Sequence, residues 1–407
     1  MAIAAEIQNR SFDPWAVIGR AEFAERQVRF RQAMLAAGFR AALVASRGGG
    51  APDMSADVLW LANHYVPGPY VGDEAGLGRA RQHAFLVFGE ARTIAVADVE
   101  SLRTDLLVAD RLDLNVDVPA AVGAALREQG TGSGRVLLVG ASYMTAAAYL
   151  SLRRELPQVE FVVDDGFVKR LRMLKSPAEL ALLRAASQLG DRAIEAVVDA
   201  VVEGATEADA VALGAAEIYR GGGAPYDIVC GSGSDAHLYT RHRLPSADSV
   251  RRFVKGDLFH VDVYGSLGGY FFDLARSRCV GDTPDKQQRQ LLETPIAIVE
   301  AICAAVRPGA VAEDLAEIGR STEVEVSPFD SRLSERASFP AYGHGLGVSW
   351  EGPYIAPGDK SQLQAGMCLA IECRIGREGH GGAMFEQVGA VTENGFDQFT
   401  HARARWW

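Results

Sequence analysis

Two pairs of carboxylates, each divided by a glycine-rich turn, constrain this chain more than any other feature. In HVDVYGSLGGYFFD, Asp262 and Asp273 lie in two apolar runs on either side of residues 265–269. A β-hairpin with Leu267 and Gly268 as its two-residue loop would place the aspartates directly opposite each other, with Cβ atoms about 5 Å apart. Two like charges so placed in an apolar sheet need either raised pKa values or a cation between them.

A second segment repeats the arrangement. Glu372 ends one apolar run and Glu386 opens the next, and a hairpin centred on Gly379 pairs the two glutamates. Two facing carboxylate pairs in one region predict a metal site built from hard oxygen ligands.

A histidine supplies a fifth candidate ligand. His344 lies in GHGLG, residues 343–347, where glycines allow close backbone approach and leave the imidazole accessible. Two aspartates, one histidine and two glutamates can bind two divalent ions and activate a bridging water. Sets of this kind accept Mn, Fe, Co or Zn, so the sequence predicts two divalent metal ions without selecting the element.

Composition excludes several other classes of protein. The chain has 407 residues, 48% hydrophobic and 23% charged, which is the balance of an ordered globular protein of two domains. A net charge of −11 argues against nucleic-acid partners. No apolar run is long enough for a membrane span, and residues 1–12 lack a signal pattern. The five cysteines form no CxxC pair, which favours buried thiols and a cytoplasmic location.

Two domains are indicated along the chain. Residues 20–165 alternate helical stretches with short apolar runs at 39–46, 84–88, 93–97, 136–139 and 159–163, as an α/β domain does. After a boundary near 165, Ser176 and Glu179 form a capping box that starts a helix. A second helix is expected over 206–220, and strands with glycine turns follow from Pro225.

The ordered set of five ligand positions resembles the metallopeptidase M24 family, the pita-bread fold of methionine aminopeptidase, prolidase, aminopeptidase P and creatinase. The supporting text is GDLFHVD, GGYFFDLARS, GHGLG, LQAGMCLAIE and FEQVGAVTENG, and the similarity covers about residues 165–400. The resemblance implies a C-terminal pita-bread catalytic domain at 166–407 and an N-terminal creatinase/prolidase-like α/β domain at 1–165. It also implies a homodimer.

The same resemblance assigns the ligands by position. Asp262 and Asp273 would hold one metal ion and bridge, His344 and Glu372 would bind the other, and Glu386 would bridge them. Creatinase itself lacks this set, so its retention here suggests a metal enzyme.

Catalytic roles are implied in the same way. Glu372 resembles the family's proton shuttle, which takes a proton from the bridging water and passes it to the leaving group. His242 resembles the substrate-side histidine that hydrogen-bonds a carbonyl or a developing oxyanion, and His237 is its rival.

Several positions depart from the family pattern. Glu351 stands seven residues after His344, where the peptidases have a second histidine that stabilises the tetrahedral intermediate. Met384 replaces the arginine with which prolidases contact their substrate, and Tyr264 and Ala275 replace a common glycine and threonine. These changes spare the metal side and alter the substrate side, so they predict metal chemistry with a changed specificity.

Three hypotheses for the function follow. The leading one is a dinuclear-metal hydrolase that cleaves a C–N bond in a small substrate, such as an unusual dipeptide, an amidino compound or a modified amino acid. The second is a metal-dependent lyase, because HGxGxxxExP also resembles the dimethylsulfoniopropionate lyases. The third is a catalytically inactive binding module, against which the intact ligand set argues.

The lyase hypothesis depends on a base beside the metal site. In those lyases an acidic residue precedes the glutamate, but here Trp350 takes that place, which leaves Glu351, Tyr342 or Tyr264 as the base. Trp350 and Tyr264, together with Tyr270 and Phe385, are alternatively expected to line a box for a cationic or planar substrate.

Overall fold

The structure is a computed structural model that describes residues 13–49, 52–66, 68, 78–98, 105–240, 245–327 and 341–407. The chain divides into two compact units, one over Trp15–Arg172 and one that contains Met173–Trp407. The division lies after α6 (Phe167–Arg172), whereas the sequence placed it at 165. The helix belongs to the first unit because Phe167 packs edge-on against Phe30, with ring centroids 5.5 Å apart.

The first unit is a six-stranded mixed sheet in the order β4-β3-β2-β1-β5-β6, and each predicted apolar run overlaps one of its strands. Apolar residues of α4 and α5 pack against one face of this sheet. The strands are β1 (Ala42–Arg47), β2 (His83–Phe88), β3 (Thr93–Ala97), β4 (Arg111–Leu114), β5 (Gly134–Val139) and β6 (Val159–Val163). The helices are α2 (Arg20–Ala36), α3 (Ala56–Ala62), α4 (Val118–Glu128) and α5 (Ala146–Glu155), with α6 already given.

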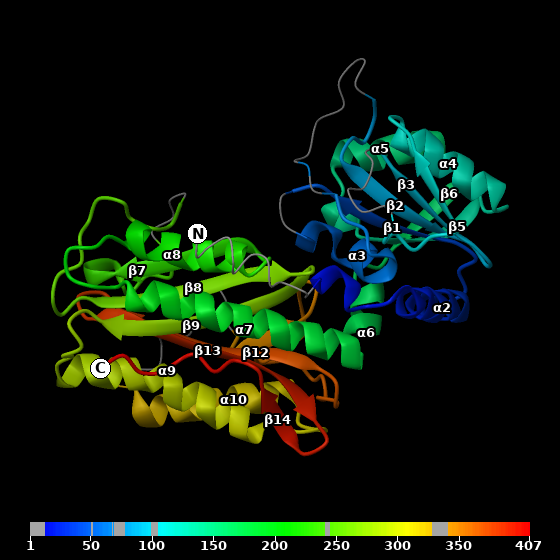
Figure 1. Ribbon diagram of the computed structural model, residues 1–407. Coiled ribbons are helices and arrows are strands. Elements are labelled where there is room, and N and C mark those ends of the chain that lie inside the picture. The colour runs from blue at the N-terminus through cyan, green and yellow to red at the C-terminus, as the bar shows by residue number, and fades with distance from the viewer. Residues whose placement is uncertain are drawn as a thin grey trace. The chain divides into compact units, whose positions relative to one another are not determined.

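The second unit contains two antiparallel sheets, ordered β7-β8-β9 and β11-β10-β12-β13-β14. Helices α7 and α8 cover the first sheet, and α9 covers β12 and β13 with α10 packed on it (Figure 1). The strands are β7 (Ala224–Ser232), β8 (Leu258–Leu267), β9 (Tyr270–Cys279), β10 (Gly343–Leu346), β11 (Trp350–Tyr354), β12 (Cys368–Arg377), β13 (Gly381–Thr392) and β14 (Gly395–Gln398). The helices are α7 (Pro177–Asp199), α8 (Glu207–Arg220), α9 (Lys286–Ala305) and α10 (Ala312–Val326).

Both predicted helix starts in this unit are present. Ser176 and Glu179 form the predicted capping box of α7, and Thr206 caps α8 in the same reciprocal way with Asp209. Such caps satisfy backbone N–H groups that the first turn of a helix leaves without partners.

The two carboxylate hairpins differ in how well their register was predicted. Glu372 lies directly opposite Glu386 across β12 and β13, as expected. The β8–β9 prediction is wrong by two residues, because Asp273 lies opposite Tyr264 and not opposite Asp262. The turn is formed by Gly268 and Gly269 with φ of 58° and 83°, a conformation that a leucine rarely adopts. A shift of two keeps both aspartates on one face of the sheet.

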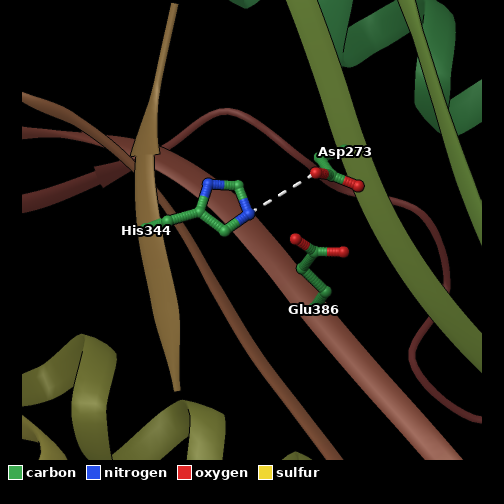
Figure 2. A group of neighbouring side chains, drawn as sticks. All are labelled: Asp273, His344 and Glu386. Carbon is green, nitrogen blue, oxygen red and sulfur yellow. Dashed lines mark ion pairs between the residues drawn. The ribbon is translucent and has the colours of Figure 1, made fainter. Parts of the chain in front are cut away.

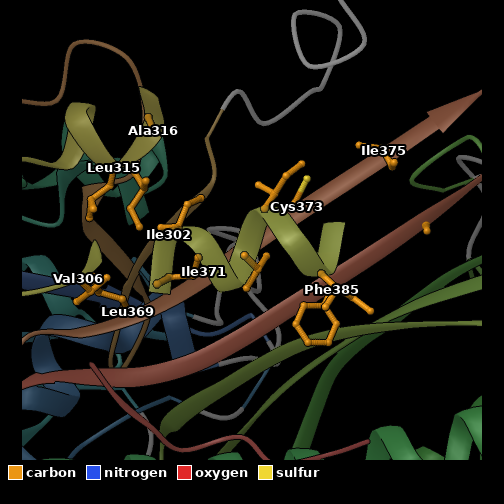
Figure 3. Close-up of a cluster of buried hydrophobic side chains, with 14 of the residues drawn as sticks. Ile302, Val306, Leu315, Ala316, Leu369, Ile371, Cys373, Ile375 and Phe385 are labelled. Atoms are coloured by element: carbon orange, nitrogen blue, oxygen red, sulfur yellow. The ribbon is translucent and has the colours of Figure 1, made fainter. Parts of the chain in front are cut away.

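The core of the second unit determines which way β12 and β13 face. Ile371, Cys373 and Ile375 of β12 and Phe385 of β13 pack into a buried apolar cluster with α9 and α10 (Figure 3). Side chains alternate along a strand, so the even-numbered residues of both strands point to the opposite face. That face carries Glu372 and Glu386.

No helix among the described residues is long and apolar enough to cross a membrane.

Candidate metal centre

Strands from both sheets bring the predicted ligands together. Asp273 from β9, His344 from β10 and Glu386 from β13 each offer a ligand atom, and these atoms lie within 4.8 Å of one another (Figure 2). Nε2 of His344 lies 3.6 Å from Oδ2 of Asp273 and 3.9 Å from Oε1 of Glu372. Asp262 belongs to the same group, because its charge raises the pKa of Asp273.

The imidazole of His344 is oriented for metal binding. Its Nδ1 lies 3.0 Å from the carbonyl oxygen of Gly345, which can only accept, so Nδ1 carries the proton and Nε2 presents a lone pair to the carboxylates. Burial lowers the pKa of His344 to about 4, so the ring is neutral at ordinary pH. A neutral imidazole with one nitrogen fixed by a backbone carbonyl is the form that binds divalent ions.

The four carboxylates are mutually unfavourable without a cation. Burial raises the pKa of Asp262 to about 7. Burial and the negative charge of Asp262 together raise the pKa of Glu372 to about 8. Burial and the neighbouring carboxylates raise the pKa values of Asp273 and Glu386 well above their usual range. Among the described residues, Oδ1 of Asp262 and both side-chain oxygens of Glu386 are buried without a hydrogen-bond partner. A divalent cation would satisfy these oxygens and offset the repulsion, so the residues fit a metal site.

Glu351 is fully buried and forms an ion pair with Lys175, which lies just before α7. The sequence analysis named Glu351 as a catalytic candidate but gave no sign of this lysine. The carboxylate of Glu351 stays charged in this ion pair, and its charge acts to raise the pKa of His344 against the larger effect of burial.

Trp350 contacts a metal ligand through its indole N–H and packs against other aromatic rings at tilted angles. Its Nε1 donates a hydrogen bond to Oδ2 of Asp273 at 2.6 Å. Its ring centroid lies 5.4 Å from that of Tyr264, 6.0 Å from that of Tyr226 and 6.3 Å from that of Phe271. Trp350 is 38% exposed and Tyr226 is 41% exposed, so these two rings are accessible to a substrate.

The composition of this aromatic group differs from the predicted one. Tyr226 and Phe271 belong to it, whereas the hydroxyl of Tyr270 donates to Glu179 and Phe385 lies beneath the guanidinium of Arg276. Residues two apart on a strand share a face, so Phe271 lies with Asp273, while Tyr270 and Phe385 lie on the faces opposite the ligands of their strands.

The remaining substrate-side candidates lie in different settings. The hydroxyl of Tyr342 donates to Glu323 of α10 at 2.8 Å, while its carbonyl accepts from the backbone of Glu372 at 3.0 Å. Nδ1 of His237 donates to the carbonyl of Ser234 at 2.8 Å. His242 lies outside the described residues.

Two neighbours of the cluster escaped the sequence analysis. Tyr239 donates from its hydroxyl to Oδ2 of Asp262 at 3.0 Å, and nothing in the sequence linked it to that aspartate. Arg374 interacts electrostatically with Glu372, and here a signal existed, because residues two apart on a strand share a face.

Carboxylates and a neutral histidine, gathered where two sheets meet, form a possible metal site of the kind that hydrolytic metalloenzymes use. Residues 181–393 match the sequence model of metallopeptidase family M24, which is more than half of the chain. The chain therefore belongs to this family, and the prediction of an M24 metallohydrolase is confirmed at that level.

Known relatives agree with this assignment. The chain is 29% identical to the Xaa-Pro dipeptidase of Lactobacillus helveticus over 268 residues, 63% of this chain and 68% of the relative. It is 32% identical to the probable dipeptidase PepE of Mycobacterium tuberculosis over 237 residues, 58% of this chain and 60% of the relative.

Solved structures confirm the predicted fold. The Xaa-Pro dipeptidase from Bacillus anthracis superimposes with a TM-score of 0.77 at 20% identity and covers 94% of this chain and 99% of that chain. Dipeptidase PepE from Mycobacterium ulcerans gives a TM-score of 0.74 at 26% identity, over 95% of this chain and 98% of that chain. These coverages include both units of the present chain.

Proposed function

We propose that this protein is a metal-dependent hydrolase that cleaves a C–N bond in a small substrate of dipeptide size. The observation that carries the proposal is the group of four carboxylates and one neutral histidine, with buried carboxylate oxygens that lack a hydrogen-bond partner among the described residues and that a cation would satisfy. Relatives named Xaa-Pro dipeptidases support the reaction class. Two divalent ions, of Mn, Fe, Co or Zn, fit the number of oxygen and nitrogen ligands.

The proposed ligands are Asp262, Asp273, His344, Glu372 and Glu386. When bound, divalent ions polarise a substrate carbonyl and lower the pKa of a water molecule, which supplies the nucleophile at neutral pH. The residues of the chain then orient the substrate and move the proton.

Glu372 is the proposed proton carrier. Its side chain is 18% exposed, against 5% for Asp273 and His344, so it is the more accessible to a substrate. A carboxylate oxygen of Glu372 takes up the proton when water attacks the carbonyl carbon, and it delivers that proton to the departing nitrogen as the C–N bond breaks. His242 is proposed to donate a hydrogen bond to the oxygen that gains charge.

The aromatic group Tyr226, Tyr264, Trp350 and Phe271 is the proposed wall of the substrate site. Its accessible members would contact an apolar or cationic part of the substrate. Because Trp350 and Glu351 occupy the segment where the peptidases have their second histidine, we propose a specificity that differs from ordinary Xaa-Pro cleavage.

Two further proposals concern the setting of the enzyme. All five cysteines are free thiols, which supports a cytoplasmic location. A homodimer is proposed from the resemblance to the prolidase and creatinase branch.

The proposal is tested by replacing two ligands and one control. Asp273→Ala and Glu386→Ala should each lose bound metal and turnover. Glu323→Gln, which changes a buried carboxylate outside the metal ligands, should lose neither. Full activity in either alanine variant would refute the proposal.

The reaction type is tested separately. A panel of Xaa-Pro dipeptides, creatine-like amidines and sulfonium zwitterions is incubated with metal-loaded protein in ¹⁸O-labelled water. Hydrolysis places the label in one product, whereas elimination gives an unsaturated product without the label, which would establish the lyase alternative instead.

A further inference from the structure

We propose that Arg374 binds the carboxylate of the substrate and so replaces the arginine that prolidases carry at the position of Met384. This inference deepens the proposed function and rests on it. It assigns a substrate class, small molecules with a free carboxylate, to a residue that the sequence analysis did not consider.

The register of one hairpin carries the inference. Arg374 on β12 lies directly opposite Met384 on β13, one pair removed from Glu372 and Glu386. Directly paired residues have Cβ atoms about 5 Å apart. A cation at 374 therefore occupies the same row of the hairpin as a cation at 384 would, and on the same face.

Burial along the two strands fixes that face. The odd-numbered residues Ile371, Cys373 and Ile375 pack into the apolar core with α9, and Glu372 and Arg374 between them are only partly buried. Arg374 thus stands on the face of the metal ligands. Arg374 and Glu372 are two residues apart on β12, so their side chains leave the strand as neighbours on one face.

The guanidinium of Arg374 is held in place by a neutral partner, a backbone carbonyl. Nη1 donates to the carbonyl oxygen of His237 at 3.0 Å. Within the described ranges, no carboxylate forms an ion pair with Arg374. Arginine has five N–H donors in a planar fork, so one bond to a carbonyl leaves donors for a carboxylate.

The carbonyl that holds Arg374 is itself fixed by glycines. Gly376 and Gly382 are cross-strand partners at the end of the hairpin. A Cβ atom on Gly376 would lie 2.8 Å from the backbone of His237, and one on Gly382 would lie 2.2 Å from the carbonyl oxygen of Ala236. This close approach allows the segment to present its carbonyl to Arg374, so His237 acts here through its backbone.

Met384 cannot make the equivalent contact. Met384 is 2% exposed, and its backbone N–H and carbonyl oxygen both form hydrogen bonds with the hydroxyl of Ser277 on β9. In this chain the cation of that row therefore stands on β12, at Arg374, and not on β13.

The test compares an acid with its amide. Metal-loaded wild-type protein is titrated calorimetrically with the dipeptide Ala-Pro and with Ala-Pro amide, and KM and kcat are measured where turnover occurs. A charge-assisted pair at Arg374 should make the acid bind about 10- to 100-fold more tightly than the amide. Arg374→Met should abolish that preference, and Arg374→Lys should retain part of it.

Two controls keep the outcomes distinct. Metal content should be unchanged in Arg374→Met, while the preference for the acid is lost. A loss of metal from this variant would indicate structural damage. The double variant Arg374→Met with Met384→Arg should recover preference for the acid, because the cation returns to the same row.

The inference is overturned if Arg374→Met keeps the wild-type preference, or if the wild type binds acid and amide equally or binds neither. In each of these cases the proposed hydrolase can still turn over another substrate with bound metal. Failure of this inference is thereby separable from failure of the proposed function.

Discussion

Replacing one carboxylate of the metal centre by its neutral isostere should change stability in opposite directions with and without metal. Asp262→Asn keeps the shape of the side chain and its ability to accept from Tyr239. In metal-free protein it removes a buried charge that repels its neighbours, whereas in metal-loaded protein it removes a ligand.

The magnitude follows from the pKa of Asp262. Burial raises this pKa from 3.8 to about 7, so the folded carboxyl binds its proton more tightly than the unfolded one. This contribution to stability is fully present below the unfolded pKa and is lost as the pH rises to the folded pKa. A shift of about 3 units corresponds to about 4 kcal/mol above pH 7, an upper limit because the neighbouring carboxylates share the penalty.

At pH 8 the metal-free variant should therefore be more stable than the metal-free wild type by about 2 to 4 kcal/mol, or roughly 5–15 °C in melting temperature. Metal at 100 times its Kd should stabilise the wild type by about 2.7 kcal/mol. The variant should show little of that metal-dependent increase.

Thermal unfolding is measured with a chelator and with added Mn²⁺, at pH 5 and at pH 8. The control Glu323→Gln also removes a carboxylate whose pKa burial raises, but it should leave the metal-dependent increase intact. The reasoning is refuted if metal-free Asp262→Asn melts below the metal-free wild type at pH 8, or if its response to metal is undiminished.

Three further predictions address the supporting residues. Lys175→Met removes the ion-pair partner of buried Glu351 and should lower the free energy of unfolding in denaturant by about 3–5 kcal/mol. The added change Glu351→Met should largely restore it, and a loss below about 1 kcal/mol for Lys175→Met would contradict the cost of an unpaired buried charge. Trp350→Phe keeps an aromatic ring but loses the hydrogen bond to Asp273, so the metal Kd measured by chelator competition should rise about 10- to 100-fold. An unchanged Kd would show that the indole N–H does not orient Asp273 for metal binding. Gly376→Ala introduces a backbone clash and should cost about 1–3 kcal/mol in thermal unfolding, whereas wild-type stability would show that the segment yields freely.

Local turn chemistry decided which register could be predicted. The β12–β13 hairpin turns around Gly379, which has φ of 79°, and the facing glutamates follow from that centre. In the other hairpin, the glycine pair 268–269 is the only adjacent pair able to adopt positive φ at both central positions. The requirement for positive φ at both turn positions therefore places the turn at 268–269 from the sequence alone. The prediction failed because it chose the register that pairs the two aspartates.

Contacts between distant segments were not predictable in this way. Lys175 meets Glu351 across 176 residues, and Tyr239 reaches Asp262 from a loop with no periodic pattern. Such contacts depend on how the sheets pack, which alternation along one strand does not encode. Arg374 differs, because its spacing from Glu372 alone placed it on the metal-ligand face.

If Asp262, Asp273, His344, Glu372 and Glu386 hold divalent metal, the purified protein contains it. After reconstitution with Mn²⁺ and removal of free ions, elemental analysis should give close to two ions per chain for the wild type. Glu386→Ala should give markedly fewer. A wild-type chain that retains no divalent ion from Mn, Fe, Co or Zn, or a Glu386→Ala variant with wild-type content, would contradict the account.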